Sequence, residues 1–321
     1  MTVTEAAAMT PTAPPPPAPI DTFVCVHERD LGPLFEVTLR SYQRHFGPKG
    51  RLFLISNNVT RVRDFLACGG MTGLATLSAD DEWLSRQEQT LPGWYRQQII
   101  KLRAHRFCMT ERFCSLGADT VLLQEIGTED FVAGGRAVLY YNKATSVADY
   151  LLNLHHLRYE RDRVKHVARI LRVEPRRARR YGDFIFDLFC FQRDYLVDLE
   201  AYLTRHHGAE PYAHLLRGLG GGQPDTSPFG GWTQNRFGEW TLYSVYVLDC
   251  LRADVVVRNA TPGYFQQVHS PRQLRRSGFD AKVVHLVSKE LNLDAIRARI
   301  AARDAELARC LVSRQAPALA S

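Results

Sequence analysis

Residues 113–123 read Phe-Cys-Ser-Leu-Gly-Ala-Asp-Thr-Val-Leu-Leu, two short apolar runs on either side of a small acidic turn. Each run has the length of one β-strand, and the turn Gly117-Ala118-Asp119 separates them. Strand ends carry the ligand sites of many α/β proteins, so the carboxylate of Asp119 is a candidate ligand-binding group. A single carboxylate in a turn is also typical of a helix cap or of a solvated loop. The surrounding sequence has to separate these interpretations.

Strand-like and helix-like segments alternate around this turn. Apolar strand patterns at 22–27, 52–55 and 75–78 alternate with helical patterns at 34–46, 61–68 and 94–107. Such alternation is typical of a mostly parallel sheet covered by helices on both faces. No G-x-G-x-x-G motif follows the first strand and no G-x-x-x-x-G-K-[ST] motif occurs, which argues against a dinucleotide-binding Rossmann domain and a P-loop NTPase. A bound nucleotide is therefore expected to contact side chains at the strand ends.

The second half of the chain has a different pattern. A strongly apolar strand is expected over 183–191, interrupted by Asp187, and helices are expected over 195–206 and from 239 to about 251. The segment 216–231 is rich in Gly and Pro and is typical of a long functional loop. Further strands are expected at 255–257 and 282–287, and Asp294 is expected to cap a last amphipathic helix.

The net charge of +7 over 321 residues comes largely from one segment, 158–180. Apolar residues recur there at helical spacing, which predicts one or two amphipathic helices with a basic face. That face is either simply solvated or contacts an anion, such as an acceptor carrying phosphate or carboxylate. Few aromatic residues are interleaved and no nucleic-acid motif occurs, so nucleic-acid binding is disfavoured.

The chain is expected to divide into three parts. Residues 1–20 are a Pro/Ala-rich leader expected to be disordered, without the pattern of a secretory signal. Residues 21–290 are expected to form one domain with a helical insertion at about 146–181, and 291–321 a C-terminal amphipathic helix and tail. No apolar run is long enough to span a membrane. The seven cysteines are scattered singly, which is typical of a reducing cytoplasm.

Five segments, taken together, resemble one family. Residues 116–121, Leu-Gly-Ala-Asp-Thr-Val, resemble the "LDADTV" segment of GT-A-type glycosyltransferases, which use nucleotide sugars. Residues 94–102 are similar to the "WY-QQ--KL" helix of a poorly characterised bacterial branch, and 183–191, 239–243 and 285–289 agree with its later motifs in order and spacing. The resemblance covers roughly 21–300. It implies a GT-A-like α/β fold and a glycosyltransferase that moves a sugar from a nucleoside-diphosphate donor to an unknown acceptor.

The resemblance also implies site residues. The second acid of the family's D-x-D turn, Asp119, would bind Mn²⁺ or Mg²⁺ together with His285, whereas without the resemblance His285 is a core histidine. The first acid is replaced by Gly117, so charge neutralisation without a metal, by Lys101 or Lys289, stays open. The expected donor contacts are His27, Asp30, Gln97, Lys101, Gly117, Ala118, Asp119 and Lys289.

Two further acids are candidates for catalysis. Glu239 is either the general base that deprotonates an acceptor hydroxyl or a first-turn residue that complements a helix dipole. Asp187, within an apolar strand, is either a catalytic or acceptor-binding carboxylate or half of a buried ion pair. Two other functions remain open: a sugar nucleotidyltransferase of the same fold, which lacks its expected Gly-rich N-terminal signature here, and a non-catalytic binding protein that lost the acid at position 117.

Overall fold

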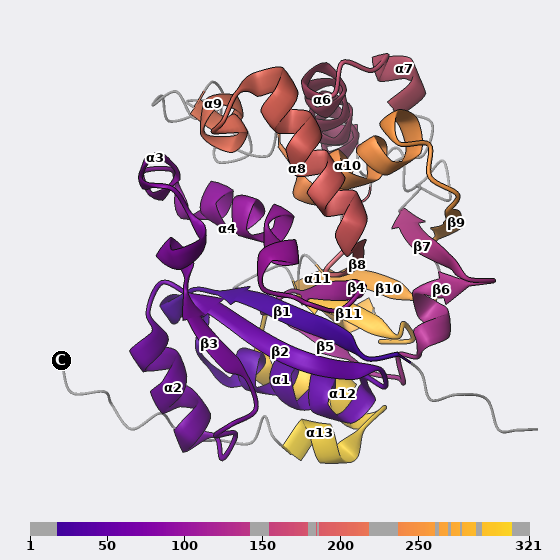
Figure 1. Cartoon of the computed structure of the whole chain (residues 1–321). Coiled ribbons are helices and arrows are strands. Elements are labelled where there is room, and N and C mark those ends of the chain that lie inside the picture. Colours follow the sequence, from indigo (N-terminus) through magenta and orange to yellow (C-terminus); the bar gives the residue numbers. More distant parts are fainter. Residues whose placement is uncertain are drawn as a thin grey trace, which may run out of the picture.

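The centre of the computed structural model is a five-stranded sheet of order β3-β2-β1-β4-β8 (Figure 1). The first four strands run parallel and β8 is antiparallel to β4. The strands are β1 (Ile20–Val26), β2 (Lys49–Ser56), β3 (Thr76–Ala79), β4 (Arg112–Leu116) and β8 (Leu188–Gln192). The structure describes residues 18–141, 154–178, 184, 186–217, 237–260, 263–268, 271–276, 278–286 and 291–309.

Two smaller sheets extend this architecture. One has the order β10-β11-β5, with β11 antiparallel to β5, so that His285 lies opposite Thr120. The other has the order β6-β7-β9. Their strands are β5 (Thr120–Leu122), β6 (Val132–Ala133), β7 (Arg136–Tyr141), β9 (Val256–Asn259), β10 (Phe265–Val268) and β11 (Val283–Leu286).

Helices cover the sheet on both sides, with α1 and α12 on one side and α4 on the other (Figure 1). Helix α1 begins with a proline at its first position, and its buried residues Phe35, Leu39 and Tyr42 recur at helical spacing and face the core. The helices around the sheet are α1 (Pro33–His45), α2 (Val59–Cys68), α3 (Arg86–Gln89), α4 (Gly93–Leu102), α11 (Pro271–Arg276), α12 (Leu293–Ala301) and α13 (Ala305–Arg309). Short 3₁₀ turns lie at η1 (Glu28–Asp30), η2 (Asp80–Trp83), η3 (Ala104–Arg106) and η4 (Thr128–Asp130).

A second group of helices lies beyond α4 (Figure 1). It consists of α6 (Leu154–Ile170), α7 (Pro175–Ala178), α8 (Arg193–His207), α9 (Pro211–Arg217) and α10 (Glu239–Val245). Helix α10 continues as a π-helical turn, η7 (Tyr246–Cys250). It packs against α4 and α6, and α8 follows β8 directly, so this group is joined to the sheet layer through both α4 and β8.

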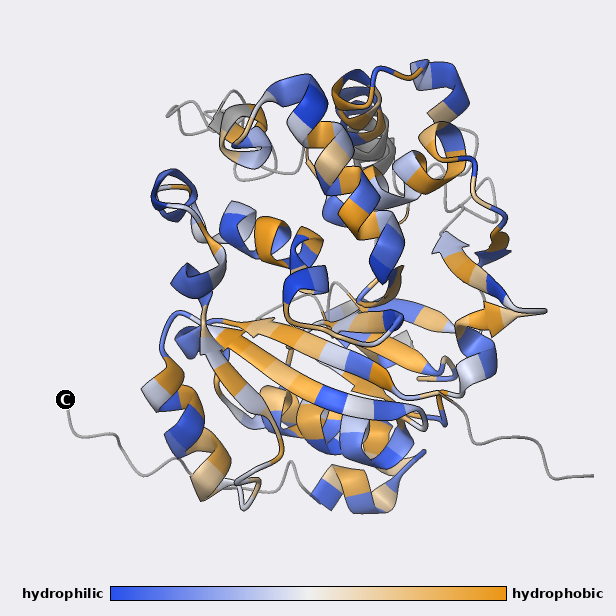
Figure 2. Cartoon of the chain, viewed as in Figure 1, coloured by the Kyte–Doolittle hydropathy of each residue, from blue (hydrophilic) through white to orange (hydrophobic). Residues whose placement is uncertain are grey.

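Apolar residues follow the strands of the central sheet (Figure 2). Phe23, Leu54 and Phe113 are completely buried in the main core. A second apolar cluster joins the small sheet to α1 and the C-terminal helices, with Val284 and Ile300 completely buried in it. Among the described residues, no helix combines the length and the apolar character needed to cross a membrane.

The predicted fold class, a mixed and mostly parallel sheet with helices on both faces, is confirmed. The two apolar runs of 113–123 are β4 and β5, and the acidic turn separates them as predicted. Strands β6, β7 and β10 were not anticipated from the sequence. The leader 1–17, most of the predicted loop 216–231 and parts of the insertion lie outside the described residues.

Two local predictions were wrong. Asp294 does not cap α12, because the side chain of Asn292 accepts hydrogen bonds from the backbone N–H groups of Asp294 and Ala295. Asp187 does not lie inside a strand, because β8 begins only at Leu188. Its carboxylate is therefore at the end of the sheet rather than in the middle of an apolar strand.

Candidate functional site

The turn that carries Asp119 is held by backbone contacts to two other segments. Leu116 and Leu188 pair in the antiparallel register of β4 and β8, which places Gly117 beside Asp187. The Gly117 N–H donates to the Asp187 carbonyl at 2.8 Å. On the other side, the Leu286 N–H donates to the Asp119 carbonyl at 3.1 Å. The carboxyl edge of β4, the start of β8 and the end of β11 therefore meet at one point.

His285 lies between two carboxylates at this point. Its Nε2 is 3.2 Å from Oδ1 of Asp119, and its Nδ1 is 2.5 Å from Oδ2 of Asp187. The side chain of Asp119 is 42% exposed, whereas His285 and Asp187 are largely buried. The structure thus brings together three residues that are far apart in the sequence, and solvent reaches them from the side of Asp119.

The charges in this cluster support one another. Burial alone would lower the pKa of His285, but the carboxylates of Asp187 and Asp119 raise it to about 10. Burial likewise opposes ionisation of Asp119, but the neighbouring His285 lowers the pKa of that carboxyl. These carboxylates favour the protonated ring, which pairs with Asp119, so a metal ion bound through Nε2 would have to displace the proton from that nitrogen.

A second ion pair joins α4 to α10 nearby. Nζ of Lys101 is 2.7 Å from Oε1 of Glu239, whose side chain is only 1% exposed. The ammonium group also lies 4.1 Å from the ring centre of Trp240, and the indole N–H of Trp240 donates to Ser115 Oγ at 3.3 Å. Oε1 of Gln98 accepts from the backbone N–H of Glu239 at 3.1 Å. These contacts fix the N-terminus of α10 against α4 and β4.

The two ion pairs act on each other electrostatically. Burial would lower the pKa of Lys101, but Glu239 and, more weakly, Asp187 raise it. The charge of Lys101 in turn contributes to the lowered pKa of Asp119. Trp240, which lies under the Lys101 ammonium, donates to Ser115 two residues before Gly117, so the second pair lies beside the end of β4 that leads into the acidic turn.

The other residues predicted to contact the donor have different surroundings from one another. His27, at the end of β1, accepts from the backbone N–H of Arg29 through Nδ1 at 3.2 Å, and Asp30 pairs with Arg29 at 3.7 Å, so both side chains have local partners. The Ala118 carbonyl accepts from the Thr38 hydroxyl at 3.1 Å, which ties the acidic turn to α1. Gln97 is half-buried, and Lys289 lies outside the described residues.

Sequence reasoning missed Gln98, Trp240, Ser115 and Thr120 as parts of the site. Gln97 was chosen because it lies four residues before Lys101, but Gln98 and Lys101, three residues apart, are the pair that faces Glu239. The signal that separates them is the phase of α4, in which Gln98 is buried and Gln97 only half-buried. Gln98, on the core-facing side of α4, therefore makes the contact with Glu239.

Asp119 and His285, the predicted metal ligands, contact each other directly. Two adjacent ligands at about 2.1 Å from one ion lie roughly 3 Å apart, and the observed separation of Oδ1 and Nε2 is 3.2 Å. Among the described residues, no group of three or more His, Cys, Asp or Glu side chains is arranged to hold a metal ion. The remaining ligands would have to come from water or from the phosphates of a bound nucleotide, which is usual for Mg²⁺.

Position 117 has no room for an acidic side chain in this structure. A Cβ built on Gly117 would lie 2.6 Å from Thr120 Oγ1 and 3.2 Å from Cβ of Asp187. Thr120 is completely buried, so it has little freedom to move away. Thr120 and Asp187 therefore crowd the space that an acidic side chain at position 117 would need.

Among the described residues of the predicted basic insertion, few lie near this site. Arg177 of α7 pairs with the buried Asp249 at 2.9 Å, and Lys165 of α6 pairs with Asp162 at 3.8 Å. Arg169 and Arg172 are exposed. The buried Arg163 approaches the start of α10, because a Cβ on Gly238 would lie 2.9 Å from its Cδ.

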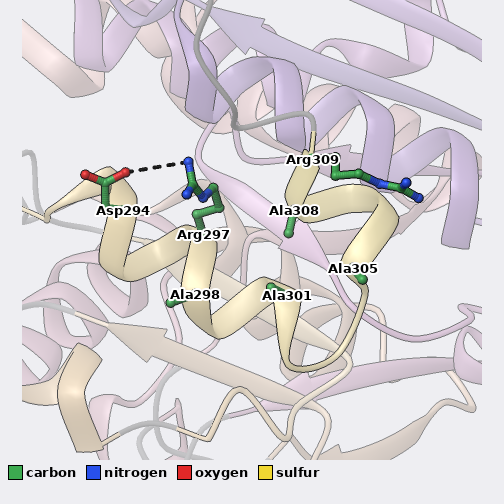
Figure 3. A pocket seen from close by; sticks show the side chains of 7 residues that line it. All are labelled: Asp294, Arg297, Ala298, Ala301, Ala305, Ala308 and Arg309. Atoms are coloured by element: carbon green, nitrogen blue, oxygen red, sulfur yellow. Dashed lines mark ion pairs between the residues drawn. The ribbon is translucent and has the colours of Figure 1, made fainter.

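A groove of about 320 Å³ lies elsewhere, along α12 and α13 (Figure 3). It is lined mainly by alanines, with Asp294 and Arg297 paired at 3.8 Å beside it. None of the charged residues around His285 lines this groove. It is therefore a separate feature of the C-terminal helices.

Solved structures with a similar arrangement include two glycosyltransferases. The apo structure of the bifunctional glycosyltransferase WbbM is 11% identical with a TM-score of 0.48, and the match covers 95% of this chain and 53% of that one, so the chain spans about half its length. The galactosyltransferase LgtC, in complex with donor and acceptor sugar analogues, is 11% identical with a TM-score of 0.44, and the match covers 92% of this chain and 97% of that one.

A search of curated proteins finds no match to the sequence. A family model matches residues 43–279, which include Lys101, Asp119, Asp187 and Glu239 and end shortly before His285. The match spans well over half of the sequence. The chain therefore belongs to the family of unknown function DUF6492.

Proposed function

We propose that this chain is a glycosyltransferase that moves a sugar from a nucleoside-diphosphate donor to an acceptor. One arrangement supports this function above all. A solvent-accessible carboxylate, Asp119, is paired with His285 at the carboxyl edge of parallel strands, and the cation Lys101 acts on the same site. Strand ends are where open α/β sheets bind nucleotides, and an acid with an imidazole suits a metal-bound diphosphate.

The chemistry explains why such a site is useful. When the bond between the sugar and the diphosphate breaks, negative charge develops on the leaving diphosphate. Asp119 and His285 would hold a divalent ion, which when bound neutralises that charge. Lys101 contributes a positive charge that acts on Asp119, because its pairing with Glu239 keeps it ionised. The chain thus offers cationic neutralisation from two sides.

In this proposal Glu239 holds Lys101 in place and is not the general base. A base must reach the acceptor hydroxyl directly or through one water. The Glu239 side chain is 1% exposed, and its Oε1 is 2.7 Å from Lys101. These contacts favour a role in holding Lys101 in place at the N-terminus of α10, where an acid also complements the helix dipole.

The proposal is tested by binding and turnover of the donor. Thermal shifts against UDP-, GDP- and dTDP-sugars, with and without Mn²⁺, identify the donor, since a ligand that binds the native state raises its melting temperature. Release of free sugar and nucleoside diphosphate is then measured for the wild type, for Asp119→Ala and for the control Asp254→Ala. Asp254 is an exposed acid paired with Arg136 at 3.2 Å, outside the site.

We expect Asp119→Ala to lower donor turnover by about 10²–10³-fold, the loss typical of removing one group that stabilises developing charge. Asp254→Ala should turn donor over like the wild type. Release of pyrophosphate from a nucleoside triphosphate and a sugar phosphate would identify a nucleotidyltransferase instead. Binding of a nucleotide sugar with no turnover in the wild type would identify a binding protein.

A further inference from the structure

Asp187 makes two contacts that no other residue of the site combines. Its backbone carbonyl accepts from Gly117 N–H, and its carboxylate lies against Nδ1 of His285. It is thereby attached both to the turn that carries Asp119 and to the histidine that faces Asp119. Because it directly precedes β8, the antiparallel pairing of β4 and β8 fixes its position.

Among the described residues, the carboxylate oxygen Oδ2 of Asp187 and the ring nitrogen Nδ1 of His285 have only each other as partners. They form an ion pair at 2.5 Å, and neither atom has a hydrogen bond to another group in the part of the chain that the structure describes. Both side chains are largely buried, so water has little access to replace the contact. The orientation of the imidazole ring therefore depends on this carboxylate.

The side chain of Asp187 also adjoins the space above Gly117. A Cβ at position 117 would approach Cβ of Asp187 to 3.2 Å. A side chain at position 117 would therefore be crowded by Asp187 as well as by Thr120, whose Oγ1 it would approach to 2.6 Å. In this chain the second carboxylate of the site comes from β8 and not from the turn.

We propose that Asp187 is a positioning residue, which holds the ring of His285 so that Nε2 faces Asp119 and which supplies the second carboxylate that the turn lacks at Gly117. Histidine ligands of metals commonly give their other ring N–H to a carboxylate, which fixes the orientation of the ring. The inference rests on the proposed use of Asp119 and His285 as ligands, but not on the identity of the donor or on turnover.

Binding of Mn²⁺ to the full chain tests this role. Bound Mn²⁺ is measured by electron paramagnetic resonance for the wild type, His285→Ala, Asp187→Ala and the control Asp249→Asn. Asp249 is another buried aspartate, and its partner is Arg177 on α7. The coupling of Mn²⁺ to a histidine nitrogen, measured by electron spin echo envelope modulation, reports directly on coordination by the ring. Thermal melting of each variant shows whether it is folded.

We expect Asp187→Ala to weaken Mn²⁺ binding by about 10–100-fold, the loss typical of removing the partner of a metal-bound histidine. The histidine coupling should be present in the wild type and in Asp249→Asn, absent in His285→Ala, and lost or reduced in folded Asp187→Ala. Wild-type affinity and coupling in Asp187→Ala would overturn the inference. So would a wild type that binds no Mn²⁺ or shows no histidine coupling.

These outcomes are separate from the fate of the proposed function. A wild type that turns donor over without binding Mn²⁺ would keep the function and remove the inference. A wild type whose Mn²⁺ site depends on Asp187, but which turns over no donor, would keep the inference and remove the function. If Asp187→Ala does not fold, the comparison is made with Asp187→Asn, which keeps the shape of the side chain and removes its charge.

Discussion

Among the described residues, histidines pair with carboxylates at His45, His105 and His285, and the clusters around His105 and His285 differ in how completely they are paired. In the cluster between η3 and α8, Nε2 of His105 is 3.0 Å from Glu200, which also pairs with Arg106 at 2.7 Å and Arg103 at 3.4 Å. Arg103 in turn binds both oxygens of the completely buried Glu88. Every carboxylate there is shared with arginines of the same chain.

The cluster around His285 is only partly paired. Thr120 Oγ1 makes no hydrogen bond in the described part of the chain, Asp187 Oδ2 and His285 Nδ1 have only their mutual ion pair, and Asp119 is 42% exposed. Buried polar groups are almost always satisfied, so groups that are not deserve a functional explanation. Under the proposed function, the first cluster stabilises the fold and the second meets the ligand.

The largest expected effect concerns the first cluster. Arg103→Ala leaves Glu88 buried without its partner, and we expect it to lower the free energy of unfolding by about 3–5 kcal/mol. Arg106→Ala is the matched control, because Arg106 pairs with the same network through Glu200 but is 46% exposed. Its cost should stay below about 1 kcal/mol. Urea denaturation measures both, and similar values for the two variants would contradict the distinction.

A smaller effect concerns the packing of the second cluster. Gly117→Ala places a methyl group against Thr120 and Asp187, and we expect a loss of about 1–3 kcal/mol. Adding Thr120→Ala should recover part of this loss, because it removes the atom that the new Cβ would approach to 2.6 Å. Adding Thr120→Val keeps an atom in that place and should recover little. Equal stability of the two double variants would show that the hydroxyl position is not the obstacle.

The smallest expected effect is a dependence of stability on acid. Burial opposes ionisation of Glu200, but its hydrogen bond to His105 and the charges of Arg106 and Arg103 lower its pKa to about 2. The folded-state pKa is thus below the ordinary value, so Glu200 stabilises the protein above about pH 4.5. This contribution is lost as the pH falls from there toward 2.

Glu200→Gln should therefore lower stability at pH 7 by about 1 kcal/mol and reduce the loss of stability between pH 5 and 3. Denaturation at several pH values measures both quantities. A variant that follows the wild-type profile in parallel would show that Glu200 is not responsible for the acid dependence.

Much of the fold was predictable because it depends on local pattern. The alternation of apolar strands with amphipathic helices predicted the parallel sheet, and the apolar runs around Asp119 predicted β4, the turn and β5. The strands β6, β7 and β10 were missed, since all three are only partly buried and β6 and β10 are also short, with two and four residues. A short strand that depends on a neighbouring strand leaves a weak periodic signal.

The site was predictable only in part, for a physical reason. The residues Asp119, His285, Lys101, Glu239 and Asp187 were named from the sequence, and the structure brings them together. Which of them touch one another depends on the register of β8 against β4 and of β11 against β5, which no local pattern contains. The packing that excludes an acid at position 117 could not be foreseen for the same reason.

The pairing of β11 with β5 has a consequence for how the protein is made. During synthesis the N-terminal part of a chain is available to fold first, and contacts between distant segments form slowly. Asp119 and Asp187 can come together as soon as β8 joins β4, but their common cation arrives only with β11, near the end of the chain. Until then both carboxylates lack this partner, so β11 both extends the smaller sheet and neutralises charge at the end of β4 in the nascent protein.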